Sequence, residues 1–165
     1  MFRHVVGSRE DLLQFASGTS ITYTDPIVVV TDGKLARLLG CDELRRWYFM
    51  EGTRIDDVDA RPIGITSLYV DASRAVIPPG VDFEHKPIHL WLEKTYGIRV
   101  GSVSQDISAV LLGAKEAATF GERPGLPALR IIRRYFDPSN ALFQISLTTN
   151  RSEDFIHNTM LRFEE

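Results

Sequence analysis

The chain has 165 residues, of which 44% are hydrophobic and 25% are charged, and its formal net charge is −3. No apolar run approaches the roughly 20 residues of a membrane-spanning helix, which excludes a membrane protein. The acidic balance is the opposite of the basic surface that binds nucleic-acid phosphates, so this chain alone is expected to bind nucleic acid poorly. The length predicts one domain over residues 1–165, with a core that needs no disulfide or metal.

Cys41 is the only cysteine, which excludes an intramolecular disulfide, a zinc ribbon and a Cys-x-x-Cys redox motif. The N-terminus lacks the apolar segment of a signal peptide. We therefore expect a cytoplasmic protein.

Four short helices are predicted from capping residues and from apolar side chains at helical spacing. Ser8 and Asp32 each precede such a segment, and Gly18 and Gly40 follow them. The other two helices are predicted over 87–96 and 114–120.

Strands are predicted wherever apolar residues alternate or β-branched and aromatic residues cluster. The predicted strands cover 21–30, 46–56, 62–71, 102–112, 128–136, 142–150 and 155–163. The links 57–61 and 137–140 are so short that they can join only antiparallel neighbours. Because the helices are inserted singly, the pattern predicts an α+β fold with one largely antiparallel sheet.

No pattern typical of a catalytic, cofactor or metal site is present. The sequence has no Gly-x-Ser-x-Gly turn, no phosphate-binding glycine loop and no His-Glu-x-x-His motif. His85 and His89 have the spacing of a helical metal-binding pair, but no third ligand is visible nearby, so we predict no metal and no cofactor. Asp42 and Glu43 would raise the thiol pKa of Cys41, which favours a small, half-buried residue over a nucleophile.

Neutral polar residues occupy one face of the strand predicted over 142–150. Its other face carries Phe143, Ile145 and Leu147. The polar row either meets water or lines a polar pocket. The row consists of Gln144, Ser146, Thr148 and Asn150.

Arg54 and Thr66 similarly lie on strands among apolar residues, where Gly52 and Gly64 leave room for a ligand or another backbone. An arginine cluster on a later strand is interpreted as solvated stems that cover a sheet face. It consists of Arg130, Arg133 and Arg134.

Several segments, in order, resemble the UTRA domain, the effector-binding domain of HutC-subfamily GntR transcriptional regulators. They include an Asp-Leu-Leu-Gln opening, a small helix followed by a Trp-led strand, the first hairpin, the end of the central helix, and a C-terminal stretch. These segments are 8–16, 35–40, 47–49, 51–54 with 62–67, 92–97, and 127–137 followed by 150–155.

The resemblance implies a chorismate-lyase-like α+β fold that encloses a small-molecule site in a homodimer. Members of this family bind DNA through a winged helix-turn-helix domain that precedes the effector domain. This chain has no such domain, so it is expected to be a fragment of a regulator.

By motif position, the resemblance places the effector site at five residues. They are Arg54, Thr66, His89, Gln144 and Asn150. Gly52 stands where sugar-phosphate-sensing members carry the first arginine of an Arg-x-Arg pair. The single Arg54 therefore favours a carboxylate or small polar metabolite over a sugar phosphate.

Two alternatives remain open at this point. A chorismate-lyase-like enzyme would share the implied fold, because a fold alone does not determine function. An interaction module without a ligand would leave the polar face in contact with water.

Overall fold

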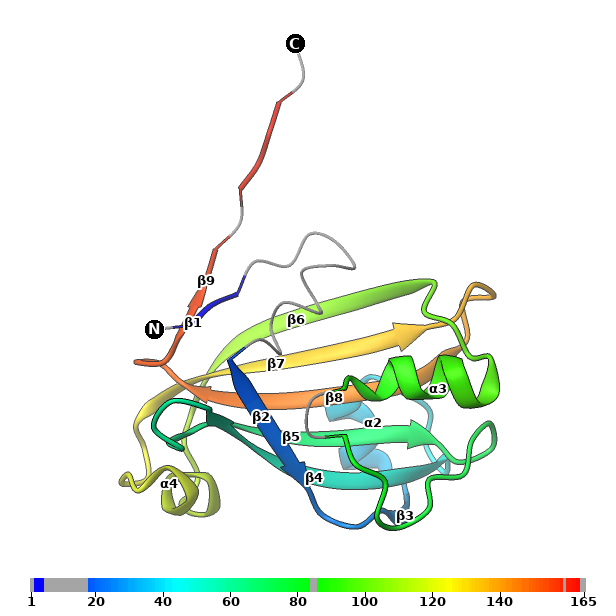
Figure 1. The fold of residues 1–165 in the computed structure, drawn as a ribbon, viewed down its shortest axis with the longest axis horizontal. Helices are drawn as coiled ribbons and strands as arrows, with labels where there is room; N and C mark the ends of the chain where they lie inside the picture. Colours follow the sequence, from blue (N-terminus) through cyan, green and yellow to red (C-terminus); the bar gives the residue numbers. More distant parts are fainter. Residues whose placement is uncertain (1, 5–17, 84–85, 159, 164–165) are drawn as a thin grey trace.

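The computed structural model describes residues 2–4, 18–83, 86–158 and 160–163. Seven strands form one antiparallel sheet in the order β2-β4-β5-β8-β7-β6, with β3 also beside β4 (Figure 1). They are β2 (Thr19–Tyr23), β3 (Ile27–Val30), β4 (Arg46–Asp56), β5 (Pro62–Asp71), β6 (Ser102–Leu111), β7 (Pro127–Phe136) and β8 (Leu142–Arg151). The short helices are α2 (Gly33–Leu39), α3 (Ile88–Tyr96) and α4 (Ala114–Phe120). The predicted α+β fold is confirmed.

Local sequence signals fixed the hairpins and caps. Residues 57–61 join β4 to β5, and residues 137–141, one more than predicted, join β7 to β8. The Asp137 carboxylate accepts hydrogen bonds from the backbone N–H groups of Ser139 and Ala141, both at 2.9 Å. Asp32 caps α2 by accepting from the Leu35 N–H at 2.7 Å, and Gly40 ends that helix in the left-handed conformation. The predicted helix near Ser8 lies outside the described residues.

Two strand predictions need correction. The run 21–30 is interrupted at residues 24–26, which belong to no strand, so that β2 and β3 pair with different parts of β4. The run predicted over 155–163 is a strand only at β9 (Phe155–His157). That strand pairs in parallel with β1 (Phe2–His4), outside the main sheet. Met160, Leu161 and Phe163 beyond it are exposed, so their apolar pattern is not used in a strand (Figure 1).

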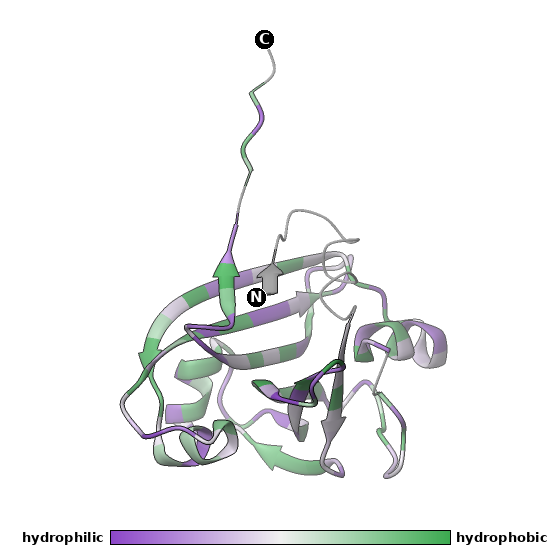
Figure 2. Cartoon of the chain, turned by 60° about the vertical axis from the view of Figure 1, so that its left-hand side comes forward, coloured by the Kyte–Doolittle hydropathy of each residue, from purple (hydrophilic) through white to green (hydrophobic). Residues whose placement is uncertain are grey.

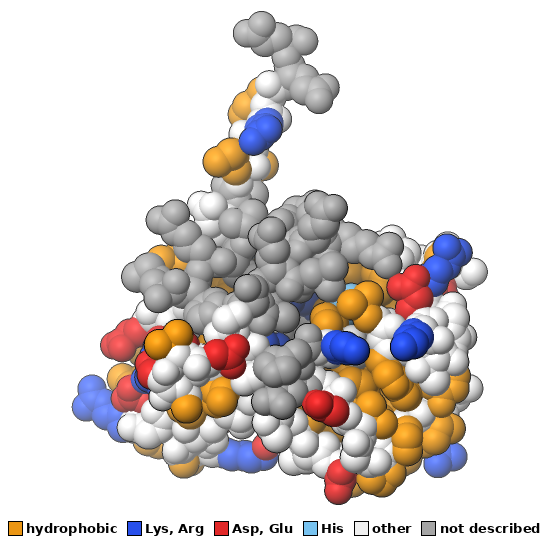
Figure 3. All heavy atoms as spheres, viewed as in Figure 1, with side chains coloured by type: hydrophobic (Ala, Val, Ile, Leu, Met, Phe, Trp, Pro, Cys, Tyr) orange, Lys and Arg blue, Asp and Glu red, His pale blue; other side chains and the backbone are white. Residues whose placement is uncertain are grey.

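Apolar clusters pack on both faces of the sheet. Hydropathy changes from residue to residue along the long strands (Figure 2). One face packs Met50, Leu68 and Val70 against α3 and the segment that precedes it. Apolar side chains gather over this region of the surface (Figure 3). The other face packs Trp47, Tyr69 and Ile145 beside Leu39 of α2. None of the helices in the described ranges has the length and hydropathy of a membrane span.

A β-bulge at Phe143 changes the predicted faces of β8. Tyr135 pairs with Gln144 and Phe136 with Leu142, so Phe143 is the additional residue. Phe143 packs with Val70 and Tyr135, in the core opposite to that of Ile145. The predicted grouping of Phe143 with Ile145 is therefore wrong, because period-2 alternation cannot show a bulge.

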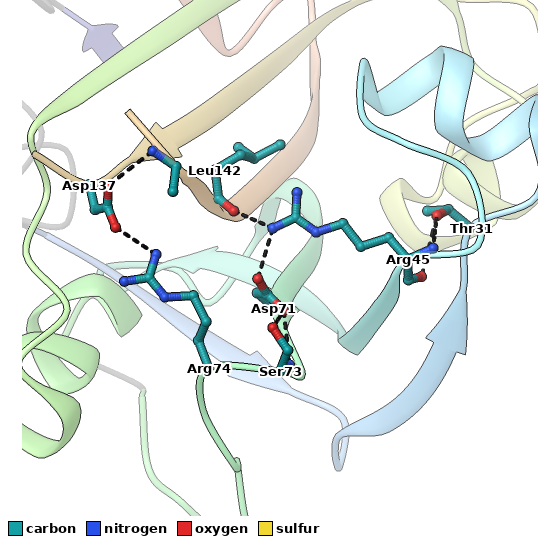
Figure 4. A network of polar contacts seen from close by, with 8 residues as sticks. Thr31, Arg45, Asp71, Ser73, Arg74, Asp137 and Leu142 are labelled. Carbon is teal, nitrogen blue, oxygen red and sulfur yellow. Dashed lines mark hydrogen bonds and ion pairs between the residues drawn. The ribbon is translucent and has the colours of Figure 1, made fainter. Parts of the chain in front are cut away.

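A partly buried polar network joins the end of β5 to the β7–β8 hairpin (Figure 4). Arg45 forms an ion pair with Asp71 at 2.8 Å and also donates to the backbone carbonyl of Leu142. Arg74 forms an ion pair with Asp137 at 2.7 Å. Burial would raise the pKa of Asp71, but hydrogen bonds from Ser73 and Arg45 outweigh burial and lower that pKa. This network holds the strands that carry the candidate site.

Candidate functional site

The site lies on the α3-covered face of the sheet, where the central strands carry short side chains. Gly52 pairs with Thr66, and Thr66 pairs in turn with Thr148 across β5 and β8. The hydroxyls of Thr66 and Thr148 are 2.9 Å apart and share a hydrogen bond. Ser146 continues this row on β8. These short side chains form a floor that longer side chains from the outer strands can reach across.

The two glycines make room for side chains of the site itself. A Cβ at Gly64 would come within 2.9 Å of Asn150 Oδ1, and a Cβ at Gly52 within 2.7 Å of the Tyr23 ring. The expectation that these glycines admit a ligand or another backbone is therefore wrong. They admit the side chains that surround the floor.

Arg54 extends from β4 beside this floor. Its Nη1 donates to the hydroxyl of Thr19, which is 1% exposed, at 2.8 Å. Burial lowers the pKa of Arg54; nearby Tyr23 opposes this shift, and the charge of Arg133 adds to it. Asp71, at the end of β5, forms its ion pair with Arg45.

Arg133 is buried on the same face, which corrects its interpretation as a solvated stem. It is 9% exposed, and its Nε donates to Gln105 Oε1 at 2.7 Å. Burial is the main reason that its pKa is lowered. Alternation on β7 places Arg133 on the face of Ile131 and Tyr135, and the sequence could not show that this face is covered.

The other two arginines of that cluster differ from each other in their contacts. Arg134 forms an ion pair with Asp106 at 2.6 Å and donates to the Leu39 carbonyl. Arg130 has a buried Nε for which the described residues provide no hydrogen-bond partner.

Two phenols belong to the site, and the sequence did not single them out. Burial raises the pKa of Tyr23 to about 12, so this phenol stays protonated; Arg54 acts against the shift and Tyr135 adds to it. Tyr135 lies on β7 and Tyr23 on β2. Both rings lie in the core on the α3-covered face, Tyr135 as a buried member and Tyr23 packed against it.

His89 closes this face from α3. It is buried, and its ring stacks on Tyr135 with centroids 5.6 Å apart and planes inclined by 25°. Through Tyr135, His89 is placed near Gln144, which is the cross-strand neighbour of Tyr135. His85, the other half of the possible metal pair, lies outside the described residues.

Gln144 and Asn150 are almost fully buried, with exposed fractions of 3% and 4%. Gln144 Oε1 and Asn150 Nδ2 have no hydrogen-bond partner among the described residues. Asn150 lies opposite Gly64, the neighbour of Arg54, whereas Gln144 lies opposite Val70. Gln144 and Asn150 are six positions apart on β8, which is about 20 Å at about 3.3 Å per residue. The structure therefore places Asn150 with Arg54 at one end of the face and Gln144 with His89 at the other.

Other chemistry is not assembled in the part of the chain that the structure describes. No three His, Cys, Asp or Glu side chains gather there as a metal site would require. Burial is the main reason that the pKa of Cys41 is raised. The charge of Arg45 opposes this shift, and the charge of Asp42 adds to it. That thiol has no sign of activation as a nucleophile.

The profile of the UTRA domain family matches residues 19–156. The solved structure of YydK, a possible transcriptional regulator from Bacillus subtilis, superposes with a TM-score of 0.79 at 17% identity, over 96% of this chain and 67% of that one. The effector domain of PhnF from Mycobacterium smegmatis gives 0.77 at 19% identity, over 98% and 100% of the two chains.

The C-terminal domain of the histidine utilization repressor from Pseudomonas syringae gives a TM-score of 0.70 at 17% identity, over 89% of this chain and 99% of that one. The comparison with curated proteins found no match. The likeness to these solved structures supports the chorismate-lyase-like fold that the sequence implied. Because the family profile covers most of the sequence, the chain belongs to the UTRA domain family of GntR-type transcriptional regulators.

Proposed function

We propose that this chain binds a small-molecule effector over the α3-covered sheet face and thereby modulates DNA binding by a full-length GntR-type regulator. The observation that carries this proposal is the pair of buried amides, Gln144 and Asn150, each with an unpartnered polar atom. Leaving such an atom unpaired costs about 1–3 kcal/mol. A ligand that supplies the missing partners would recover this free energy on binding.

The similar structures support a sensing role. One is the effector domain of PhnF, and another is the C-terminal domain of a histidine utilization repressor. Other similar structures are the ligand-binding domain of a GntR-family regulator from Bordetella bronchiseptica and a regulator from Streptomyces coelicolor. These proteins are described as regulators, which favours a sensor over an enzyme.

We infer that Arg54 anchors an anionic group of the effector and that Asn150 reads a neutral group beside it. Asn150 and Arg54 both flank Gly64, on the strands either side of it. His89 would close the site from α3, and Thr66 would lie beneath the ligand. Gln144 would contact the far end of an extended ligand, because it lies at the other end of β8.

We also propose that the regulator is a bacterial, cytoplasmic homodimer that contacts DNA through a separate winged helix-turn-helix domain. A two-fold protein fits a palindromic operator because each half-site then meets an identical head. The net charge of −3 agrees with an indirect role of this chain in DNA binding. Sedimentation of the chain at micromolar concentrations tests whether this part of the regulator carries dimer contacts.

Native mass spectrometry of the protein as purified tests the sensing role. We expect a bound species that is lost on denaturation, and less of it in an Asn150→Leu variant. Incubation with chorismate is the parallel assay, and formation of an aromatic product would favour the enzyme alternative. A protein that carries no ligand, and that no carboxylate stabilises against heat, would favour an interaction module.

A further inference from the structure

We propose that the C-terminal segment 158–163, the arm, adds as a strand to the outer edge of β6 in a second copy of this chain. The second copy does the same in return, so that each copy both gives and receives an arm. This inference rests on the proposed homodimer, for which it names the contact surface and the residues that form it.

The arm presents three large apolar side chains to solvent. Met160 is 71% exposed, Leu161 75% and Phe163 91%. The arm projects from the body of the molecule with apolar side chains along it (Figure 3). Its sequence is typical of a strand, yet it lies beyond the end of β9 and joins no sheet of the described chain. Contiguous apolar side chains that are exposed in this way mark an interaction surface.

The pair of strands from which the arm extends is also incompletely supported. β1 and β9 pair in parallel over three residues each, outside the main sheet. Parallel strands are normally covered on both faces, and two isolated strands are barely stable in water. Ile156 in β9 is nevertheless 38% exposed. A second copy on this side of the molecule would cover both β9 and the arm.

β6 offers an open edge for an added strand. It is the last strand of the main sheet, and among the described residues it pairs with β7 alone. Proteins usually protect such an edge with proline, lysine or a β-bulge. β6 contains neither proline nor lysine, and its register with β7 is regular over ten residues. An edge of about 33 Å is therefore available for strand addition.

The apolar side chains of the arm match one face of β6. Val103 and Ile107 point to the same face of that strand and are only half-buried there. In an added strand, Leu161 and Phe163 would likewise share one face, because residues two apart do so. Placed beside Val103 and Ile107, they extend the apolar face of the sheet and lose their contact with water.

The charges match on the other face. Asp106 is the only charged residue of β6, and its side chain is 65% exposed although Arg134 holds one of its oxygens. Arg162 is the only charged residue of the arm and is exposed. Alternation places Arg162 opposite to the apolar pair of the arm, on the face where Asp106 lies in β6. The second oxygen of Asp106 can accept from this guanidinium.

The direction of the arm fits an exchange between two copies. In Figure 1, β6 is the uppermost strand of the main sheet and the arm extends beyond it, and Figure 2 shows the arm leaving on the same side. A copy related by a two-fold axis on this side directs its own arm back toward the first copy. The exchange then uses both β6 edges and closes the assembly as a dimer.

The surface available is sufficient for a stable dimer. A specific interface buries about 1,200–2,000 Å² in total. A large apolar side chain buries about 150 Å², so the six of two arms, with the equal areas that they cover, bury about 1,800 Å². The arms therefore supply an interface of ordinary size without a further contact.

Sedimentation equilibrium of the whole chain over a range of concentrations tests the inference. We expect a dimer, and we expect the double variant Leu161→Ser, Phe163→Ser to raise its dissociation constant at least about tenfold, because apolar burial is lost. The matched control is Val58→Ser, since Val58 is 94% exposed in the β4–β5 turn. This control should dimerise as the unmodified chain does.

The two levels of the proposal fail in different ways. If the double variant dimerises as tightly as the unmodified chain, the arm is not part of the interface and the proposed homodimer stands. If the unmodified chain is monomeric at every concentration, the exchange of arms is overturned and the dimer contacts belong to the DNA-binding domain. Neither result alters the proposed effector binding, which native mass spectrometry tests separately.

Disulfide cross-linking identifies the receiving strand, in chains that carry Cys41→Ser so that no other thiol reacts. A chain with Arg162→Cys, mixed with one carrying Asp106→Cys, should form a covalent heterodimer of distinct mass under mild oxidation. The matched control replaces the second chain with Val28→Cys, because Val28 is exposed on β3, away from β6 in the sheet. Heterodimers with the Val28 variant alone, or with neither variant, would overturn β6 as the receiving edge.

Discussion

Gly64 and Asn150 lie directly opposite one another in the β5–β8 ladder, and a Cβ at Gly64 would come within 2.9 Å of Asn150 Oδ1. The absence of a side chain at residue 64 therefore determines where the Asn150 amide can lie. Because the obstructed atom is the end of a side chain, a methyl group at residue 64 would displace the amide and not the strands.

We predict that Gly64→Ala folds normally but moves the Asn150 amide. The side-chain N–H₂ resonances of Asn150 should shift, while the free energy of unfolding changes by no more than about 1 kcal/mol. Gly33→Ala is the matched control, because a Cβ there would lie equally close to a side-chain oxygen, Glu43 Oε1. That control is remote from the site and should leave the Asn150 resonances in place. Unshifted Asn150 signals in Gly64→Ala would contradict the described packing.

Arg54→Ala tests the anionic anchor. We expect it to weaken binding of a co-purified effector by about ten- to hundredfold, since a charge-assisted contact contributes about 1.5–3 kcal/mol. The thermal midpoint of the ligand-free chain should change little, because a buried charge is removed together with its hydrogen bond to Thr19. Calorimetric titration and thermal unfolding measure the two effects. A chain that unfolds but keeps its affinity would make Arg54 a structural residue instead.

Local sequence signals accounted for much of this architecture. Turn chemistry at 57–61 and 137–140 determined the hairpins, because each link is too short for any other connection. Period-2 alternation also grouped Thr148 and Asn150 on one face, which their pairing with Thr66 and Gly64 confirms, since the face within a strand depends on residue parity.

Features that depend on distant packing were not predictable in this way. Alternation placed Arg133 beside Tyr135 but could not show that this face is covered, so its burial was missed. The bulge at Phe143 reversed one predicted orientation. The pairing of residues 155–157 with residues 2–4 joins the two ends of the chain, and no local pattern specifies such a contact.

Substitution of two glutamines should have opposite effects on stability. Gln144→Met removes a buried oxygen that has no partner among the described residues, so the ligand-free chain should gain about 1 kcal/mol, or about 2–4 °C. Gln105→Met removes the acceptor of the Arg133 Nε–H, so that variant should lose about 1–3 kcal/mol. Thermal unfolding compares them directly. A lower midpoint for Gln144→Met would show that its oxygen is satisfied in solution.

The Arg45–Asp71 pair should make stability depend on pH. The pKa of Asp71 is lowered in the folded chain, so its contribution is present above the unperturbed value of 3.8 and is lost as pH falls through the lowered pKa. Asp71→Asn should therefore destabilise the chain at pH 7, and the difference from the unmodified protein should shrink below pH 3.8.

Chemical denaturation at several pH values measures this pH dependence. At one pH, the same method applied to variants of two ion pairs measures how burial determines the strength of an ion pair. Arg45–Asp71 and Lys115–Glu51 have the same N–O distance of 2.8 Å, but the Lys115 side chain is 75% exposed and that of Asp71 only 8%. Arg45→Met leaves a buried carboxylate without its guanidinium and should cost about 1.5–3 kcal/mol. Lys115→Met should cost less than about 1 kcal/mol, because water screens an exposed pair. Equal losses in the two variants would mean that the network in Figure 4 contributes no more than a surface contact.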